Sequence, residues 1–193
     1  MKKQCSILMI AIAACAFQAC NNSGKDSKSS ADSVNAVKDT TTTGKTGIGV
    51  DKDDAKFAVD AANGGMAEVE LGKLAQQKAT DSKVKDFGAM MVSDHSKAND
   101  ELKALAKTKN ITLPDSVSKD EKKNMTDLTK KTGHDFDKAY VKGMVDDHKK
   151  DVKEFEDATK NLKDPDLKAF ATKTLPVLKS HLAAITAIHD RMK

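Results

Sequence analysis

From Asp51 onward, apolar residues recur at spacings of three and four, which is the periodicity of a helix with one buried face. Four stretches carry such a stripe, and they predict four helices, over residues 57–79, 84–105, 136–162 and 167–192. The links after the first and third stretches are only a few residues long. Each of these two pairs is therefore predicted to form an antiparallel hairpin.

The link between the two hairpins is much longer and runs for about 25 residues, from Lys109 to Gly133. It contains a short predicted helix, because Ser118 and Glu121 have the spacing of a capping box. A link of this length can return along the height of a bundle, as in ferritin-like proteins. We therefore expect an all-α fold, a ferritin-like antiparallel four-helix bundle over residues 51–193, with an ordinary up-and-down bundle as the alternative.

The first 19 residues have the pattern of a lipoprotein signal peptide. Two lysines precede an apolar run over residues 7–17, which is too short to span a bilayer but long enough for a signal sequence. A small residue, Ala19, then precedes Cys20, after which the sequence at once becomes polar. We expect cleavage before Cys20 and acylation of this cysteine, with Cys15 as the alternative.

Residues 20–50 are rich in Ser, Lys, Asp, Thr and Gly and have too few apolar residues to form a core. We expect this segment to be a disordered tether between the lipid and the folded domain. Asn21, directly after the acylated cysteine, favours transport to the outer membrane by analogy with lipoprotein sorting. The expected location is the cell envelope, with the lipid in the outer membrane and the domain facing the periplasm. The inner membrane is the alternative.

Composition and charge argue against several classes of function. The formal net charge is only +4, and both signs alternate along the predicted helices. No basic stripe follows a phosphate backbone, so nucleic-acid binding is not expected. All three cysteines lie within the first twenty residues, so the domain has no disulfide framework, thiolate metal site or cysteine nucleophile.

Each of the four apolar stripes is interrupted once, near its middle, by a residue able to bind a proton or a metal ion. These residues are Glu68, His95, His148 and His181. A buried carboxylate or unpaired imidazole costs several kcal/mol unless it finds a partner. Because the middles of four antiparallel helices meet at one level, the four side chains can satisfy one another by converging. The pattern predicts one buried site, with these four residues as the candidate metal ligands.

A sequence echo surrounds two of the histidines. The pattern Met-Val-x-Asp-His ends at His95 and again, 53 residues later, at His148. The aspartate of each copy lies about 100° around the helix from the histidine, where it can accept an imidazole proton. Tyr140 is expected to hydrogen bond to a histidine or to Glu68. The residues expected to support the site are Asp94, Asp147, Tyr140, Met91 and Met144.

These features resemble the bacterial family catalogued as domain of unknown function 4142, which is placed in the ferritin-like superfamily. The resemblance runs from about Asp51 to Met192. Besides the two Met-Val-x-Asp-His copies, its motifs are Phe87, Leu113-Pro114, Phe136-Asp137, Tyr140-Val141, Leu175-Pro176 and His181-Leu182. The resemblance implies an exported four-helix domain, and it implies no activity.

The candidate ligands differ from those of di-iron proteins, which use Glu-x-x-His motifs in this fold. Here the residues three positions before the histidines are Val92, Val145 and Leu178, and Glu68 is the only carboxylate in the set. Di-iron chemistry is therefore not expected. Three imidazoles and one carboxylate suit Zn²⁺ or a copper ion, and the methionines of the two echo copies could serve as soft ligands for Cu(I).

Three functions are compatible with the sequence. The first is an exported lipoprotein that handles a transition metal in the envelope or protects against stress. The second is a non-catalytic structural or interaction module, in which the buried His/Glu network serves only to fix the bundle. The third is a metal-dependent oxidoreductase, which the missing carboxylates disfavour, so no enzymatic activity is assigned. The expected partner is the membrane, through the lipid, while a protein partner and the oligomeric state are left open.

Overall fold

The computed structural model describes residues 26–39 and 48–192, and this part of the chain contains helices and connecting segments but no strand. The helices are α1 (Ser27–Asp39), α2 (Lys52–Lys78), α3 (Ser82–Thr108), α4 (Lys119–Thr129), α5 (Gly133–Asn161) and α6 (Pro165–Arg191). The expected all-α class is confirmed. The predicted signal peptide over residues 1–19 and the predicted acylation site, Cys20, lie outside the described residues. The described helices include no candidate for a membrane span.

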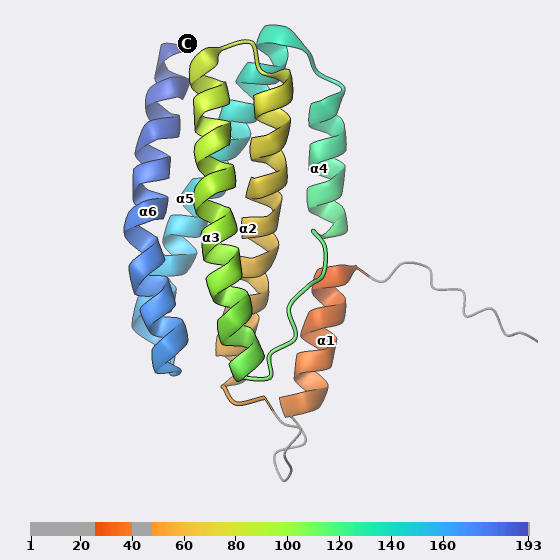
Figure 1. Ribbon diagram of the computed structural model, residues 1–193, viewed down its shortest axis with the longest axis vertical. Helices are drawn as coiled ribbons and strands as arrows, with labels where there is room; N and C mark the ends of the chain where they lie inside the picture. Colours follow the sequence, from red (N-terminus) through yellow and green to blue (C-terminus); the bar gives the residue numbers. More distant parts are fainter. Residues whose placement is uncertain (1–25, 40–47, 193) are drawn as a thin grey trace, which may run out of the picture.

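The four long helices lie side by side as two antiparallel hairpins (Figure 1). The most extensive contacts between helices join α2 to α3 and α5 to α6. Smaller contacts join α2 to α5 and α3 to α6. The connection after α3 returns along the molecule through α4, so α5 begins at the end where α3 begins and runs in the same direction (Figure 1).

Polar side chains cap the helices, and Ser118 does so where the capping-box spacing predicted it. The Asp164 carboxylate accepts a hydrogen bond from the N–H of Leu167 at 2.9 Å at the start of α6. The Ser118 hydroxyl accepts one from the N–H of Glu121 at 3.3 Å at the start of α4. The N–H of Ser118 donates to the Asn63 side chain at 2.8 Å, which ties the long connection to α2.

Two buried aspartates tie each hairpin to the turn of the other hairpin. Asp54 on α2 accepts a hydrogen bond from the N–H of Asp164, in the α5–α6 turn, at 2.6 Å. Asp137 on α5 accepts one from the N–H of Asp81, in the α2–α3 turn, at 2.9 Å. The helix aspartates Asp54 and Asp137 are 83 residues apart, and so are the turn aspartates Asp81 and Asp164. The second hairpin therefore repeats this contact of the first. The 53-residue echo instead relates α3 to α5, which occupy different places in the two hairpins.

The interior consists of two apolar clusters with a polar layer between them. The first cluster contains Phe57 and Phe155, whose ring centroids are 5.1 Å apart. On α3, Met91 belongs to the second cluster and Leu102 to the first, and His95 lies between them. On each of the other long helices the predicted site residue also lies between residues of the first cluster and residues of the second. Each site residue therefore lies where the two clusters meet.

Helix α1 corrects the prediction of disorder for residues 27–39 of the expected tether over residues 20–50, of which residues 20–25 and 40–47 lie outside the described residues. It lies against α2 and beside the connection that follows α3 (Figure 1). Of its apolar residues Ala31 is buried, whereas Val34 and Val37 are exposed. A helix with so small an apolar face leaves little periodic signal, which is why the pattern of apolar residues predicted no structure here.

Polar contacts hold α1 in place. The buried Asn35 side chain exchanges two hydrogen bonds with the backbone of Thr112, at 2.9 and 2.8 Å. Lys28 forms an ion pair with Asp60 of α2 at 2.7 Å. The folded part of the chain therefore begins before Asp51, where the apolar periodicity starts.

Helices α2 and α3 approach each other closely at Gly72 and Gly88. A Cβ atom added to Gly88 would lie 2.7 Å from the carbonyl oxygen of Gly72, and one added to Gly72 would lie 2.6 Å from that of Gly88. Backbone atoms cannot move aside as the end of a flexible side chain can. Any larger residue at either position must therefore push the two helices apart.

We expect Gly88→Ala to lower the free energy of unfolding by about 1–3 kcal/mol, the usual cost of overpacking. Urea denaturation followed by circular dichroism measures this change. The control is Gly143→Ala on α5, where an added Cβ would meet no atom within 4 Å. That variant should gain up to about 1 kcal/mol from helix propensity. Equal stability of the two variants would contradict the close approach of α2 and α3.

Candidate metal centre

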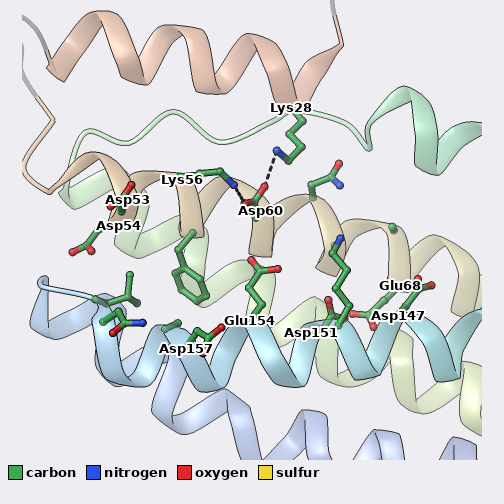
Figure 2. A pocket seen from close by; sticks show the side chains of 18 of the residues that line it. Lys28, Asp53, Asp54, Lys56, Asp60, Glu68, Asp147, Asp151, Glu154 and Asp157 are labelled. Atoms are coloured by element: carbon green, nitrogen blue, oxygen red, sulfur yellow. Dashed lines mark hydrogen bonds and ion pairs between the residues drawn. The ribbon is translucent and has the colours of Figure 1, made fainter.

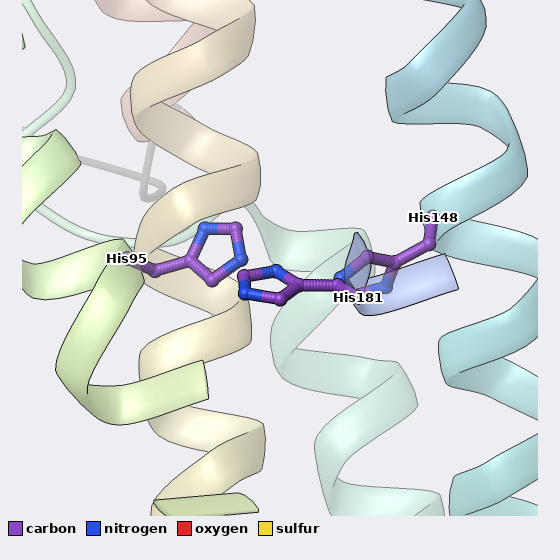
Figure 3. A group of neighbouring side chains, drawn as sticks. All are labelled: His95, His148 and His181. Atoms are coloured by element: carbon purple, nitrogen blue, oxygen red, sulfur yellow. The ribbon is translucent and has the colours of Figure 1, made fainter. Parts of the chain in front are cut away.

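The middles of the four long helices bring the predicted ligands together. Glu68 on α2, His95 on α3, His148 on α5 and His181 on α6 are all buried, with exposed fractions between 0% and 6%. Each histidine offers one ring nitrogen such that the three nitrogens lie within 4.8 Å of one another (Figure 3). Within the described part of the chain, these histidines are the one group of three or more His, Cys, Asp or Glu side chains close enough to hold a metal ion.

One nitrogen of each imidazole is held by an acceptor at the edge of the site. Nδ1 of His148 lies 2.9 Å from the carbonyl oxygen of Met144, which can only accept a hydrogen bond. Nδ1 of His95 lies 2.8 Å from Oε2 of Glu68. Nε2 of His181 lies 3.0 Å from Oδ2 of Asp94. Each contact places the proton of a neutral ring on the outer nitrogen and leaves a lone pair on the other nitrogen.

The remaining nitrogens are buried and have no hydrogen-bond partner. They are Nε2 of His95, Nε2 of His148 and Nδ1 of His181. Oε1 of Glu68 and the hydroxyl oxygen of Tyr140 are also buried without a hydrogen-bond partner. In the described residues, no other buried side-chain nitrogen or oxygen lacks a partner. Buried polar atoms in folded proteins are nearly always paired, so five exceptions around one site require a physical cause.

The contact between Glu68 and His148 shows which kind of partner these atoms lack. Oε1 of Glu68 lies 3.3 Å from Nε2 of His148, without a hydrogen bond between them. Because Nδ1 carries the proton of a neutral His148, its Nε2 presents a lone pair to a carboxylate oxygen. Two acceptors at this distance repel each other unless a proton or a cation lies between them. The site is therefore built to receive positive charge.

Burial sets the protonation of these groups. It lowers the pKa of His95 to about 4, against the opposing carboxylates of Asp151 and Asp94, and it also lowers the pKa values of His148 and His181. The three rings are therefore neutral at pH 7, which is the form that binds metals. Burial also raises the pKa of Glu68 to about 7, although the nearby imidazole of His148 opposes this shift.

A groove of about 610 Å³ lies beside the site, between α2 and α5, and Glu68 forms part of its wall (Figure 2). Carboxylates outnumber lysines along it. Three of them, Asp147, Asp151 and Glu154, share one face of α5 at spacings of four and three residues. Burial and the neighbouring carboxylates, Glu68 first among them, raise the pKa of Asp151 to about 9. Sequence reasoning named Asp147 as a supporting residue but missed Asp151 and Glu154, although their shared face was an available signal.

Comparison with known proteins places the chain in a family. Residues 39–188 match the family described as Domain of unknown function (DUF4142). The chain belongs to the DUF4142 family. This result confirms the resemblance found in the motifs. No curated protein and no solved structure is significantly similar to the chain, so the function of this DUF4142 protein has to be argued from its site.

The aspartates of the two echo copies have different surroundings in this DUF4142 protein. Asp94 contacts the imidazole of His181, the kind of contact that the sequence predicted for it. Asp147 lies in the wall of the groove, where its charge acts on Glu68. The equal spacing of the two copies therefore does not give their aspartates equal contacts, because α3 and α5 face different neighbours.

Tyr140 and the two methionines support the site through packing. The expectation that Tyr140 hydrogen bonds to a histidine or to Glu68 is wrong, because its buried hydroxyl has no partner. Its ring packs between Phe87 and Phe136, with centroid distances of 6.4 and 6.0 Å, and this packing fixes where the hydroxyl lies. Met91 and Met144 are buried in the same apolar cluster. A role for their sulfurs as copper ligands stays a prediction.

His95 should contribute to the metal-free DUF4142 protein a stability that is lost as the pH falls from about 6.5 to about 4. The unfolded chain binds a proton at His95 below its ordinary pKa of 6.5, whereas the folded chain does so only near pH 4. At this group the unfolded state holds more protons over this window, so acid favours it by on the order of 3 kcal/mol, whereas the raised pKa values of Glu68 and Asp151 act in the opposite direction. Denaturant titrations in EDTA at several pH values measure the slope.

Replacing His95 by Gln should remove this contribution, so acid should destabilise the variant less than it destabilises wild type. Replacing the exposed His134 by Gln is the matched control and should leave the slope unchanged. The same pH dependence in wild type and in His95→Gln would show that His95 is not buried as a neutral ring.

Proposed function

We propose that this protein is a lipid-anchored envelope protein whose ferritin-like four-helix domain binds one transition-metal ion. His95, His148 and His181 provide three nitrogen ligands, and Glu68 provides an oxygen ligand. The observation that carries the proposal is the meeting of three buried histidines, each with one ring nitrogen within 4.8 Å of those of the others, in a site where one nitrogen of every ring and Oε1 of Glu68 have no hydrogen-bond partner. The function that follows is metal handling or protection against metal stress in the envelope.

The donor set fits Zn²⁺ or a copper ion. Three neutral imidazoles and one carboxylate match the ligand types and the coordination number of zinc sites, and imidazole also suits copper. Hydrogen bonds such as those of His148 with Met144 and of His181 with Asp94 orient metal-binding histidines in proteins. The nitrogens lie within 4.8 Å of one another and roughly 3.4 Å is expected around tetrahedral zinc, so small movements of the rings are enough to complete the geometry.

The ferritin-like assignment rests on the path of the chain. Two antiparallel hairpins are joined by one long connection that returns along the molecule, and α3 and α5 run in the same direction. An up-and-down bundle would have consecutive helices that run in opposite directions throughout. Residues 7–17 and Cys20 support an exported lipoprotein through the sequence alone.

The purified full chain, prepared without a histidine tag, should hold one equivalent of Zn²⁺ or copper by elemental analysis after dialysis against the metal. His148→Ala and His181→Ala should each weaken binding by at least about 100-fold, because the loss of even an outer hydrogen-bond partner costs 10- to 100-fold. His134→Ala and His189→Ala, which lie outside the cluster, are the matched controls and should bind as wild type does.

Metal should also stabilise the fold. A free metal concentration of 100 times Kd adds about 2.7 kcal/mol to the free energy of unfolding, and EDTA removes this gain. A melting temperature that does not respond to Zn²⁺, copper or EDTA would favour the alternative, a structural or interaction module with a metal-free polar network. Turnover of peroxide or oxygen by the metal-loaded protein would favour the second alternative, a metal-dependent oxidoreductase.

The lipid anchor has its own test. Cells fed a radiolabelled fatty acid should label the wild-type protein and Cys15→Ala, and they should not label Cys20→Ala, because only Cys20 is expected to carry the lipid. Cys20→Ala should also leave the membrane fraction. Loss of label in Cys15→Ala with retention in Cys20→Ala would move the anchor to Cys15, and label in neither wild type nor variants would remove it.

A further inference from the structure

We propose that a divalent cation reaches the three histidines through the acidic groove between α2 and α5, and that Glu68 passes the cation from the groove to the imidazoles. This inference rests on the metal site proposed above. It assigns a function to carboxylates that do not belong to the ligand set.

The groove continues into the interior. A second, smaller cavity of about 30 Å³ lies between the helices and is lined by His95. Five residues line both spaces: Asp60, Gly64, Glu68, Asp151 and Glu154. The smaller cavity has room for one or two water molecules, or for an ion that has lost part of its hydration shell. The two spaces therefore meet at the side of the site where Glu68 lies.

Glu68 connects the two spaces chemically. Its side chain is only 4% exposed and still lines the groove. Oε2 contacts Nδ1 of His95, while Oε1 lies 3.3 Å from Nε2 of His148 and has no hydrogen-bond partner. An ion held at the inner end of the groove can thus bind Oε1 of Glu68 before it meets the first imidazole.

Charge draws cations to this route. The chain has a net positive charge, yet the groove wall is mainly acidic (Figure 2). Asp60 is paired with both Lys28 and Lys56. Asp147 forms none of the ion pairs found in the described residues, so its charge is available to a cation. A concave acidic surface raises the local cation concentration and the rate of association.

The groove is a route rather than a second binding site. In the described residues, the three histidines are the one group of three or more His, Cys, Asp or Glu side chains whose ligand atoms come close enough to hold an ion. The groove carboxylates are spread along the wall and form no such group. They can attract an ion and release it inward, whereas the histidines retain it.

Gly64 provides a way to close the route without touching a ligand. It lines both spaces, and a Cβ atom added there would meet nothing within 4 Å. A leucine at this position has room to fold and would occupy the passage. Gly143 on α5 also has nothing within 4 Å of an added Cβ and does not line the groove, so Gly143→Leu is the matched control.

Stopped-flow mixing of the metal-free full chain with Cu²⁺ measures the rate of association through quenching of Tyr140, because the chain has one tyrosine and no tryptophan. We expect Gly64→Leu to slow association at least 10-fold and to slow dissociation by a similar factor, so that Kd changes less than about 3-fold. Gly143→Leu should associate as wild type does. Gly64→Ala, which adds one methyl group, should lie between wild type and Gly64→Leu.

Charge removal tests the same route independently. Asp147→Asn/Glu154→Gln should slow association several-fold at low salt, and the difference should vanish near 1 M salt, where the Debye length is about 3 Å. Asp146→Asn/Glu156→Gln is the control, because these acids lie outside the groove wall. If Gly64→Leu does not fold, the comparison of these two double variants decides whether the cation enters through the groove.

The outcomes separate the two proposals. If wild type binds no Cu²⁺ and no Zn²⁺ at equilibrium, the metal site itself is overturned. If wild type binds copper but Gly64→Leu and the groove charge variant both associate at the wild-type rate, the site stands and the route is overturned. The ion would then reach the histidines elsewhere, for example past the partly exposed Asp94.

Discussion

The contact of one nitrogen of each buried imidazole with an oxygen acceptor decides what the other nitrogen can do. The carbonyl oxygen of Met144 and the carboxylates of Glu68 and Asp94 hold the ring protons at the edge of the site. Burial then keeps the rings neutral, because an imidazolium ion would lose its hydration there. Three lone pairs are left facing a space between two apolar clusters, where they cannot reach bulk water. A cation in that space would satisfy the inner nitrogens and the free oxygen of Glu68 together.

The rest of the fold keeps these groups at one level. Asp54 and Asp137 tie each hairpin to the turn of the other, so the hairpins cannot slide along each other without breaking buried hydrogen bonds. The close approach of Gly72 and Gly88 sets the spacing of α2 and α3. The apolar clusters on either side of the polar layer exclude water, so the site opens sideways, toward the groove. Stability, ligand orientation and access therefore depend on separate sets of residues.

The sequence predicted the long helices, their caps and the residues that meet between them, because each of these leaves a local signal. Apolar residues at helical spacing mark the buried face, and a polar group within that face marks a place where it needs a partner. Three features could not be predicted in this way. Helix α1 is held by polar contacts such as that of Asn35 with Thr112. The groove depends on which helix faces lie opposite each other, and the unpaired hydroxyl of Tyr140 depends on how its ring packs. These are properties of contacts between distant segments, and they have no periodicity.

The most direct test of the inward lone pairs is a measurement of the histidine tautomers by long-range ¹H–¹⁵N NMR on the metal-free chain near pH 7. The contacts with oxygen acceptors at the edge of the site predict a proton on Nδ1 of His95 and His148 and on Nε2 of His181. Addition of one equivalent of Zn²⁺ should then shift the opposite nitrogen of each ring. Protons on Nε2 of both His95 and His148, the form that predominates for histidine in water, would mean that the lone pairs point away from the site and that the three imidazoles do not form a metal centre.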